Sequence, residues 1–495
     1  MKKNKFNYVL VFQVIFLLAS ISSCNSIKDN KNPKQQTETA FVSPLSTILN
    51  STKTIETSGD LEVVRGDNIP WKGNGALTWE VEIAEKDDYE FYLVANVRLE
   101  GSGSKVYLKT QNKEYAFKLA QTKGPFQGVN NIPNYNIQNF QRFKLPGKIS
   151  LDAGVQQITI STSGIENEDV LFDLRSAELL PVSKKAEIIN EEIRAKNARA
   201  SFDWMNKSGY GLMFHWTSRS VQQDGSSKSF EDAVNEFDVE KFANMVEETG
   251  AGYVYFTIGH AERYCPAPIK SWERIHPGQT TKRDLIEEIA NALNKKGIRF
   301  LCYINAPGTF KFSTHDDNNE ETKQAFVANF TDILTEMGNR YQDKIAGYWF
   351  DSWYQIFQGY QEVPFEAFYK ASKIGNKDRI ICLNPWIYPD VSPWQDYWSG
   401  EIQNPIAPPK NGYMENGPSP NLPYQALLTM EPFVWVQNKP EIADPKFTSE
   451  QLSTYIKKCK VNGGAVTINL AIYQDGTVGK KALQVMKEVN KNIKN

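Results

Sequence analysis

Residues 344–353, with the sequence KIAGYWFDSW, combine the pattern of a buried strand with a carboxylate between aromatic rings. The apolar run predicts a strand that ends at Asp351, with Trp349 and Trp353 on either side of it. Aromatic rings can hold the face of a sugar ring, and a carboxylate can attack or stabilise its anomeric carbon. The segment fits equally an ordinary strand whose exposed Asp begins a turn. A carbohydrate site and a solvated turn are therefore the two alternatives at this point.

Other polar residues occupy the same kind of position at the ends of further predicted strands. These residues are His215 with Trp216, His260, Asn305 and Asn384. In a barrel of parallel strands the carboxyl ends meet at one face, which carries the active site. The repeated placement of polar and aromatic residues at these ends favours a site over simple packing.

From residue 201 onward, predicted strands alternate with amphipathic helices. Strands are expected at 211–216, 252–258, 298–305, 345–351, 379–384 and 465–469, and helices at 239–249, 283–296, 322–341 and from 479 onward. This alternation over residues 201–495 predicts an irregular (β/α)8, TIM-type barrel. A doubly wound sheet is the alternative, but no glycine-rich phosphate loop follows the first strand. Residues 385–445, rich in Pro, Gly and Trp, are expected to form irregular loops over the barrel mouth.

The region before the barrel has a different pattern. Short runs with alternating apolar residues occur at 77–83, 89–95, 105–109, 157–161 and 170–174. Period-2 alternation between turn residues predicts an all-β sandwich over residues 55–182. Residues 149–160, followed by Asp173 and Leu174, resemble the closing strands of jelly-roll carbohydrate-binding modules, and a purely structural spacer is the alternative. The charged, Ala-rich residues 183–200 predict a helical connector, so the expected chain is multidomain.

The amino terminus has the pattern of a secreted protein. A basic start at residues 1–5 and an apolar run at 8–19 precede the sequence ISSC, which resembles a bacterial lipobox with Cys24 as the lipidated residue. An ordinary signal peptide is the alternative. We therefore expect a leader at 1–23, a flexible tether at 24–54, and a protein lipid-anchored to the bacterial cell envelope, in the periplasm or on the cell surface.

Charge and cysteine usage narrow the classes of function. Without the leader the chain has 53 basic and 58 acidic residues, a mild balance of −5 that argues against a nucleic-acid partner. The four later cysteines are far apart and form no CxxC, and Cys302 and Cys382 lie in apolar runs expected to bury them as thiols. The four histidines show no HExxH spacing, so no metal site is expected.

Four motifs resemble, in order and spacing, those of glycoside hydrolase family 29, the α-L-fucosidases. Residues 211–216, GLMFHW, resemble the first-strand signature GMFIHWG, and residues 237–254 resemble the helix and strand that follow. Residues 348–351, YWFD, resemble LWFDG, and residues 460–477 resemble GGNLLLNxxPxxDG. The resemblance covers about residues 201–490. It implies a retaining glycoside hydrolase that removes terminal L-sugars from a glycan and needs no cofactor.

The resemblance also implies roles for single residues. Asp351 matches the family nucleophile, which forms a covalent glycosyl intermediate. Glu401, in the segment DYWSGE at 396–401, matches the region where the family often places its acid/base, with Glu415 and Glu431 as rivals. His215 and Trp216 match residues that contact the sugar, although a His bonded to backbone is an alternative for His215.

The second-strand motif departs from the family pattern TKHHDGF. Residues 257–264 read TIGHAERY, which keeps one imidazole, His260, and places Gly259 where the other would be. Thr217 and Ser352 replace usual glycines. Since Gly259 leaves room, α-L-galactose or another substituted L-sugar is an alternative substrate, and an inactive glycan-binding surface lipoprotein is a further alternative. The full set of expected sugar contacts is His215, Trp216, His260, Tyr264, Trp349, Trp353, Asn305, Glu262 and Arg263.

Overall fold

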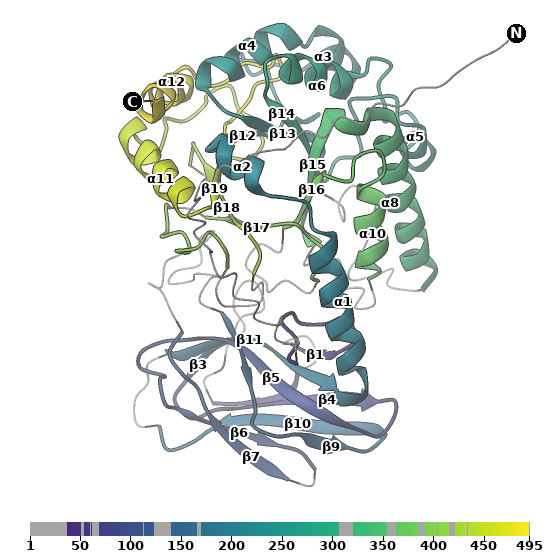
Figure 1. The fold of residues 1–495 in the computed structure, drawn as a ribbon, viewed down its shortest axis with the longest axis vertical. Coiled ribbons are helices and arrows are strands. Elements are labelled where there is room, and N and C mark those ends of the chain that lie inside the picture. The colour runs from purple at the N-terminus through teal and green to yellow at the C-terminus, as the bar shows by residue number, and fades with distance from the viewer. Residues whose placement is uncertain are drawn as a thin grey trace, which may run out of the picture. The chain divides into compact units, whose positions relative to one another are not determined.

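The computed structural model describes residues 37–50, 54–59, 61, 69–111, 113–122, 140–165, 170–305, 320–353, 363–384, 392–402, 404–414, 421–432 and 434–494 (Figure 1). By its internal contacts the chain divides into Met1–Thr37 and Glu38–Asn495, and every element described below belongs to the second unit. Cys24 and Glu415, two of the predicted functional residues, lie outside the described residues.

The amino-terminal part of this unit contains two antiparallel sheets. One consists of β1 (Thr47–Leu49), β3 (Ile69–Lys72), β5 (Asp87–Val97), β8 (Gln141–Lys144), β9 (Ile149–Leu151) and β11 (Val170–Pro181). The other consists of β2 (Thr54–Ser58), β4 (Ala76–Ile83), β6 (Lys105–Lys109), β7 (Glu114–Lys118) and β10 (Gly154–Thr162). Alternate residues of β4 point inward, and Trp79 packs in one hydrophobic core with Phe91 of β5 and Ile158 of β10. Two sheets sharing one core form a β-sandwich.

The tether predicted for residues 24–54 ends earlier than expected. Thr47–Leu49 pairs with β11, and Phe41, Val42 and Leu49 are buried. The prediction was wrong for these residues because the segment is polar overall and too short to show a strand pattern. The predicted connector is confirmed as α1 (Lys185–Ala198), which follows the 3₁₀ turn η3 (Val182–Lys184).

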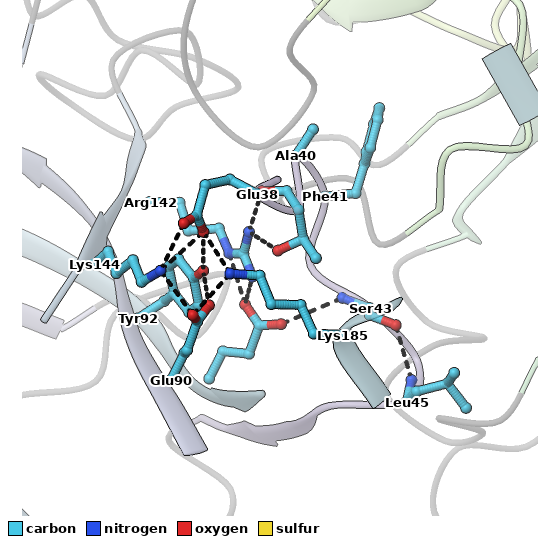
Figure 2. A network of polar contacts seen from close by, with 12 residues as sticks. Glu38, Ala40, Phe41, Ser43, Leu45, Glu90, Tyr92, Arg142, Lys144 and Lys185 are labelled. Carbon is cyan, nitrogen blue, oxygen red and sulfur yellow. Dashed lines mark hydrogen bonds and ion pairs between the residues drawn. The ribbon is translucent and has the colours of Figure 1, made fainter. Parts of the chain in front are cut away.

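Polar contacts hold residues 38–43 in place, and Figure 2 shows those around Glu38 and Glu90. The Glu192 carboxylate on α1 accepts hydrogen bonds from the backbone N–H groups of Ala40 and Phe41, at 2.8 and 2.9 Å. Glu90 on β5 accepts hydrogen bonds from Lys144 and Lys185, each at 2.8 Å. Burial alone would raise the pKa of Glu90, but these lysines and the Tyr92 hydroxyl outweigh it and lower the pKa to about 2.

The carboxy-terminal part is a ring of eight parallel strands. They are β12 (Tyr210–Phe214), β13 (Tyr253–Gly259), β14 (Arg299–Asn305), β15 (Ile345–Asp351), β16 (Ile380–Leu383), β17 (Trp398–Glu401), β18 (Tyr424–Thr429) and β19 (Ala465–Asn469). Their order is β16-β15-β14-β13-β12-β19-β18-β17, so the first strand of the ring pairs with the last. This pairing rules out the doubly wound alternative and is that of a nearly closed (β/α)8-like barrel.

Helices surround these strands (Figure 1). They are α2 (Asp203–Ser208), α3 (Phe230–Glu236), α4 (Val239–Thr249), α5 (Lys270–Ile275), α6 (Leu285–Lys295), α8 (Glu320–Tyr341), α10 (Phe365–Ser372), α11 (Ser449–Val461) and α12 (Lys480–Lys494), with the 3₁₀ turn η4 (Gln342–Lys344) after α8. Asp238 caps the start of α4 by accepting the Lys241 N–H, and Gly250 ends it with φ +78°. No helix among the described residues is long and apolar enough to cross a membrane.

Two barrel strands lie where irregular loops were expected. Both β17 and β18 fall within residues 385–445, so that prediction was wrong for these residues. Asp396 joins β17 to the other end of the strand order, because its N–H donates to Ile381 O at 2.8 Å and its carboxylate accepts the Ile381 N–H at 2.7 Å. The same buried carboxylate accepts a hydrogen bond from Lys373 at 2.8 Å. These contacts between Asp396 and β16 position β17, the strand that ends at Glu401.

Candidate active site

Side chains alternate between the inside and the outside of the barrel, and this alternation selects the site residues. On β15, Trp349 belongs to the inner cluster and Phe350 to the core between strands and helices, so Asp351 returns to the inner face. On β14, Tyr303 is inward and Ile304 outward, so Asn305 is inward. The inward residues at the carboxyl ends of these strands therefore form one group.

Four donors surround the carboxylate of Asp351. Its Oδ2 accepts hydrogen bonds from the Tyr303 hydroxyl at 2.7 Å, from Asn305 Nδ2 at 3.1 Å and from Ser352 Oγ at 3.0 Å. Its Oδ1 accepts one from Asn384 Nδ2 at 2.6 Å. Burial, followed by the nearby Asp351 charge, raises the pKa of Tyr303 well above its usual value, so this phenol stays a donor. The carboxylate is thus held in a fixed orientation, with Oδ1 the less occupied oxygen.

Asn384 connects Asp351 to the second carboxylate. Its Nδ2 also donates to Glu401 Oε1 at 2.5 Å. Because one nitrogen touches both carboxylates, the two accepting oxygens can be no farther apart than these two bonds laid end to end, about 5 Å, which is the spacing of the acid pair in retaining glycosidases. The structure therefore brings together the two residues that the sequence placed 50 positions apart.

A cluster of aromatic rings lies beside the carboxylate pair. The rings of His215 and His260 lie 5.1 Å apart and nearly perpendicular, and the Tyr303 ring is 4.6 Å from His215 and 5.6 Å from His260. Trp435 lies 5.1 Å from His215 on another side. Burial lowers the pKa of His215 to about 3, with a further contribution from His260, and burial also lowers the pKa of His260. Both imidazoles are neutral at ordinary pH.

Each imidazole has a polar partner on one ring nitrogen. His215 Nδ1 lies 2.7 Å from Asn469 Oδ1, so the alternative of a His bonded only to backbone does not hold. His260 Nδ1 lies 3.1 Å from Arg219 Nη2, and Arg219 forms an ion pair with Glu262. Glu262 therefore reaches the histidine cluster through an arginine that the sequence analysis did not single out.

The backbone is unusual at two positions next to site residues. Ser352, directly after Asp351, has φ +62°, and Ala261, directly after His260, has φ +59°. Side-chain-bearing residues rarely adopt this left-handed region, and the cost is about 1–2 kcal/mol. The strand ladder is also irregular between Thr257 and Gly259. The two positive-φ residues redirect the chain immediately after Asp351 and His260, and the ladder irregularity lies just before His260.

The structure does not bring every expected sugar contact into this group. Trp216 follows inward-facing His215 and points outward, where it is 1% exposed, packs on Phe256 and donates to Gln474 O at 3.0 Å. Trp353 is buried outside the strands against Phe330 and other rings of α8 and α10. These two expectations are not supported: alternation along the chain turns Trp216 outward. Trp353 lies beyond the end of β15, after Ser352 with its positive φ, where the strand alternation no longer applies.

Of the remaining expected contacts, Trp349 lies inside the barrel, whereas Tyr264 and Arg263 lie apart from the site residues. Trp349 is fully buried in the inner cluster two residues before Asp351, which places it in the barrel interior below the carboxylates. Tyr264 is half-buried and packs on Phe230 at 5.0 Å, while the Arg263 side chain is exposed. Neither Tyr264 nor Arg263 has a described contact with Asp351, His215 or His260.

Four residues of the site were missed by sequence reasoning: Tyr303, Asn469 at the end of β19, Arg219 and Trp435. Tyr303 could have been found, because it lies two residues before Asn305 and shares its inward face. Trp435 and Arg219 lie in loops, where no periodic pattern indicates direction. Of the two rivals for the acid/base role, Glu431 is fully buried, accepts the Ala471 N–H at 3.0 Å and has its pKa raised to about 7 by burial. No described contact links Glu431 to Asp351 or Asn384.

Among the described residues, no group of three or more His, Cys, Asp or Glu side chains is arranged to hold a metal ion. The four cysteines from Cys265 onward are buried free thiols, which confirms the prediction for Cys302 and Cys382.

Comparison with known proteins identifies a family for the barrel region. A family model described as alpha-L-fucosidase matches residues 181–495. Similar solved structures include an α-L-fucosidase of glycoside hydrolase family 29 from Bacteroides thetaiotaomicron, 17% identical with TM-score 0.46, covering 59% of this chain and 74% of that one. Another is the α-L-fucosidase AlfC from Lactobacillus casei with α-L-fucose product, 16% identical with TM-score 0.41, covering 59% of this chain and 97% of that one. No curated protein matches the chain. Since the family model spans more than half of the sequence and includes every residue of the site, the chain belongs to the α-L-fucosidase family and is a glycoside hydrolase.

Proposed function

We propose that the protein removes terminal α-L-fucose or a closely related L-sugar from glycans with retention of configuration, using Asp351 as nucleophile and Glu401 as acid/base. The observation that carries the proposal is the shared contact of Asn384 with both carboxylates, 2.6 Å from Asp351 and 2.5 Å from Glu401. A separation of at most about 5 Å between the two accepting oxygens suits direct attack by one carboxylate, whereas an inverting pair stands about 6.5–9.5 Å apart to admit water between them.

The reaction then has two steps. In the first, Asp351 attacks the anomeric carbon while Glu401 transfers a proton to the glycosidic oxygen, so the leaving alcohol departs neutral and a glycosyl ester forms on Asp351. In the second, Glu401 takes a proton from water as that water attacks the anomeric carbon, which breaks the ester and regenerates both carboxyl groups. Oδ1 is the attacking oxygen we favour, because Oδ2 already accepts three hydrogen bonds.

The ester intermediate provides a direct test. Reaction with a slow 2-fluoro α-L-fucosyl donor should add one sugar to the intact protein, and peptide mass spectrometry should place it on Asp351. Asp351→Asn should lose nearly all turnover of 4-nitrophenyl α-L-fucoside while its circular dichroism stays unchanged. A label on another residue, or substantial turnover in Asp351→Asn, would contradict the assignment. Proton NMR of the first-formed sugar should show the α-anomer.

A second candidate is the same chemistry on α-L-galactose or a substituted L-sugar. The observation that favours it is Gly259, a buried residue without a side chain where the family pattern has a second His. A panel of aryl α-L-glycosides measured side by side decides between these sugars. A third candidate is a glycan-binding protein without activity. The intact pair of carboxylates argues against that candidate, and binding of a glycan without hydrolysis of any member of the panel would favour it.

We also propose that Cys24 carries a lipid that anchors the enzyme to the bacterial envelope, on the sequence pattern alone. Cys24→Ser should release the full chain from the membrane fraction. If the β-sandwich is a carbohydrate-binding module, as its closing strands suggest, soluble enzyme should bind a glycan in the presence of saturating monosaccharide inhibitor of the barrel site.

A further inference from the structure

Arg219 is the unexpected residue of the histidine cluster, and its chemistry restricts the state of its partner. A guanidinium group has only N–H donors and keeps its proton at all relevant pH values. Because Arg219 Nη2 lies 3.1 Å from His260 Nδ1, that nitrogen must offer its lone pair. A neutral imidazole that accepts at Nδ1 carries its proton at Nε2, so His260 is a donor at Nε2.

His215 has the opposite arrangement. Asn469 Nδ2 donates to Val434 O at 3.2 Å, which fixes the orientation of the amide and turns its Oδ1 toward His215. His215 Nδ1 therefore carries the proton and donates to Asn469 Oδ1 at 2.7 Å. Its Nε2 is then an acceptor. The two neighbouring rings thus provide one donor and one acceptor, which is the complement of a single hydroxyl group.

Arg219 is held in place from both ends. Its guanidinium group is paired with the Glu262 carboxylate. The backbone N–H of Arg219 donates to Thr217 Oγ1 at 3.1 Å, and the Thr217 N–H donates to Ser220 Oγ at 3.1 Å. These bonds close a tight turn after His215, the residue that follows β12. Thr217, one of the departures from the family pattern, therefore stabilises the turn that carries Arg219.

We propose that Arg219 is a positioning residue that fixes His260 in its Nε2–H tautomer, so that His260 and His215 read one hydroxyl group of the bound L-sugar as donor and acceptor. The proposal rests on the proposed function of the barrel site. In this arrangement His215 and His260 together bind the hydroxyl group without the second imidazole that the family pattern has at the position of Gly259. An acceptor-only or donor-only substituent at the same position of the sugar would satisfy just one of the two rings.

Charge around His260 supports the same role. Burial has the largest effect on the pKa of His260 and lowers it, and the Arg219 charge lowers it further, whereas Asp351, Glu262 and a hydrogen bond with its own backbone raise it. Removing the Arg219 charge should therefore raise the pKa of His260. Protonation would then place a proton on Nδ1 as well, and the acid side of the kcat/KM profile should move to higher pH.

The direct test is the tautomer itself. With histidine labelled by ¹⁵N in the full-length chain, His260 should show an unprotonated Nδ1 and a protonated Nε2, assigned with a His260→Gln variant. In Arg219→Met the unprotonated Nδ1 signal should be lost or mixed with the other tautomer. A protonated Nδ1 in the wild-type protein would overturn the proposal, and this readout does not depend on any hydrolytic activity.

The functional test uses 4-nitrophenyl α-L-fucoside and its monodeoxy analogues. Arg219→Met should lower kcat/KM on the parent roughly tenfold, as expected for one poorly satisfied buried hydroxyl, and the loss should vanish for the analogue lacking the hydroxyl that the pair reads. Arg274→Met is the matched control, because Arg274 is an exposed arginine that forms an ion pair with Asp332 and has no described contact with the site. An equal loss on every analogue, or an unmoved acid limb, would count against the proposal. Complete inactivity of the wild type on the panel would instead refute the proposed function.

Discussion

Asn384 offers the sharpest perturbation of the carboxylate pair. Asn384→Ala removes a side chain that contacts both Asp351 and Glu401, at 2.6 and 2.5 Å. Its backbone N–H bond to Phe350 O at 2.7 Å stays possible in alanine, so the strand register should survive. The variant is therefore expected to fold and to differ from the wild type chiefly in the placement of the two acids.

The size of the effect follows from these contacts. A hydrogen bond to a charged group contributes about 1.5–3 kcal/mol, and two are lost. Water entering the space of the amide recovers part of this, so we expect a net loss of about 3 kcal/mol in transition-state stabilisation, or roughly 100-fold in kcat/KM. Because the nucleophile is misplaced for every substrate, activated aryl glycosides and natural glycosides should both be slowed.

Steady-state kinetics on substrates with good and poor leaving groups measure this loss. Asn294→Ala is the matched control, since Asn294 is exposed and its Nδ2 donates only to Lys344 O at 3.2 Å among the described contacts. Rates within a factor of two of wild type in Asn384→Ala would refute the reasoning. So would a loss restricted to poor leaving groups, because that would mean the amide serves Glu401 alone.

Three further predictions concern the acid, the second-strand motif and the sandwich. Glu401→Ala should slow glycosides with poor leaving groups far more than activated aryl glycosides, because only the former need a proton on the departing oxygen; a uniform loss would move the role to Glu431 or Glu415. Gly259→His should raise activity on the plain fucoside relative to a larger L-sugar, and equal loss on both would show that Gly259 serves the backbone. Glu90→Gln should destabilise the chain by about 2 kcal/mol at neutral pH in thermal melts, less than the pKa shift alone implies because Lys144 and Lys185 are partly exposed. Since the folded pKa of Glu90 is about 2, below its ordinary value of 4.5, this stability is fully present above pH 4.5 and is lost as the pH falls toward 2. The gap should therefore shrink by more than half at pH 3. Glu80→Gln, at an exposed position of β4, is the matched control substitution.

Local sequence patterns predicted the barrel, because apolar residues form short buried runs in its strands and recur about every 3.6 positions in its helices. The strand ending at Asp351 and the helix from Val239 to Gly250 are visible from hydrophobic spacing and a terminal glycine. The strand β17 was not predicted, because its four residues are too few to show a period and lie in a segment rich in proline and tryptophan. The segment before residue 50 was missed for a related reason, because its order comes from Glu192, far along the chain, and from pairing with β11.

Strand phase explains which site predictions the structure supports. Asp351, Asn305 and His215 were expected at strand ends and share the inner face, whereas Trp216 comes one position later and must point the other way. Period-2 alternation was present in the sequence and already excluded Trp216 from the inner face. Strand alternation in the sequence therefore predicts the direction of Trp216 correctly, whereas the motif resemblance alone placed Trp216 in the site.

The sequence by itself determined the barrel and the strand-end carboxylate Asp351, because these depend on periodicity and motif order within one segment each. It left Glu401 beside two rivals, Glu415 and Glu431, because the short strand that carries Glu401 shows no period. Only the tertiary structure decided that a single amide, Asn384, spans both carboxylates and that Arg219 contacts His260. Arg219 and His260 are 41 positions apart and meet because β12 and β13 are neighbours in the ring. Loop conformation and the direction of a long side chain depend on what packs around them, and that is set only when the strands close into a barrel.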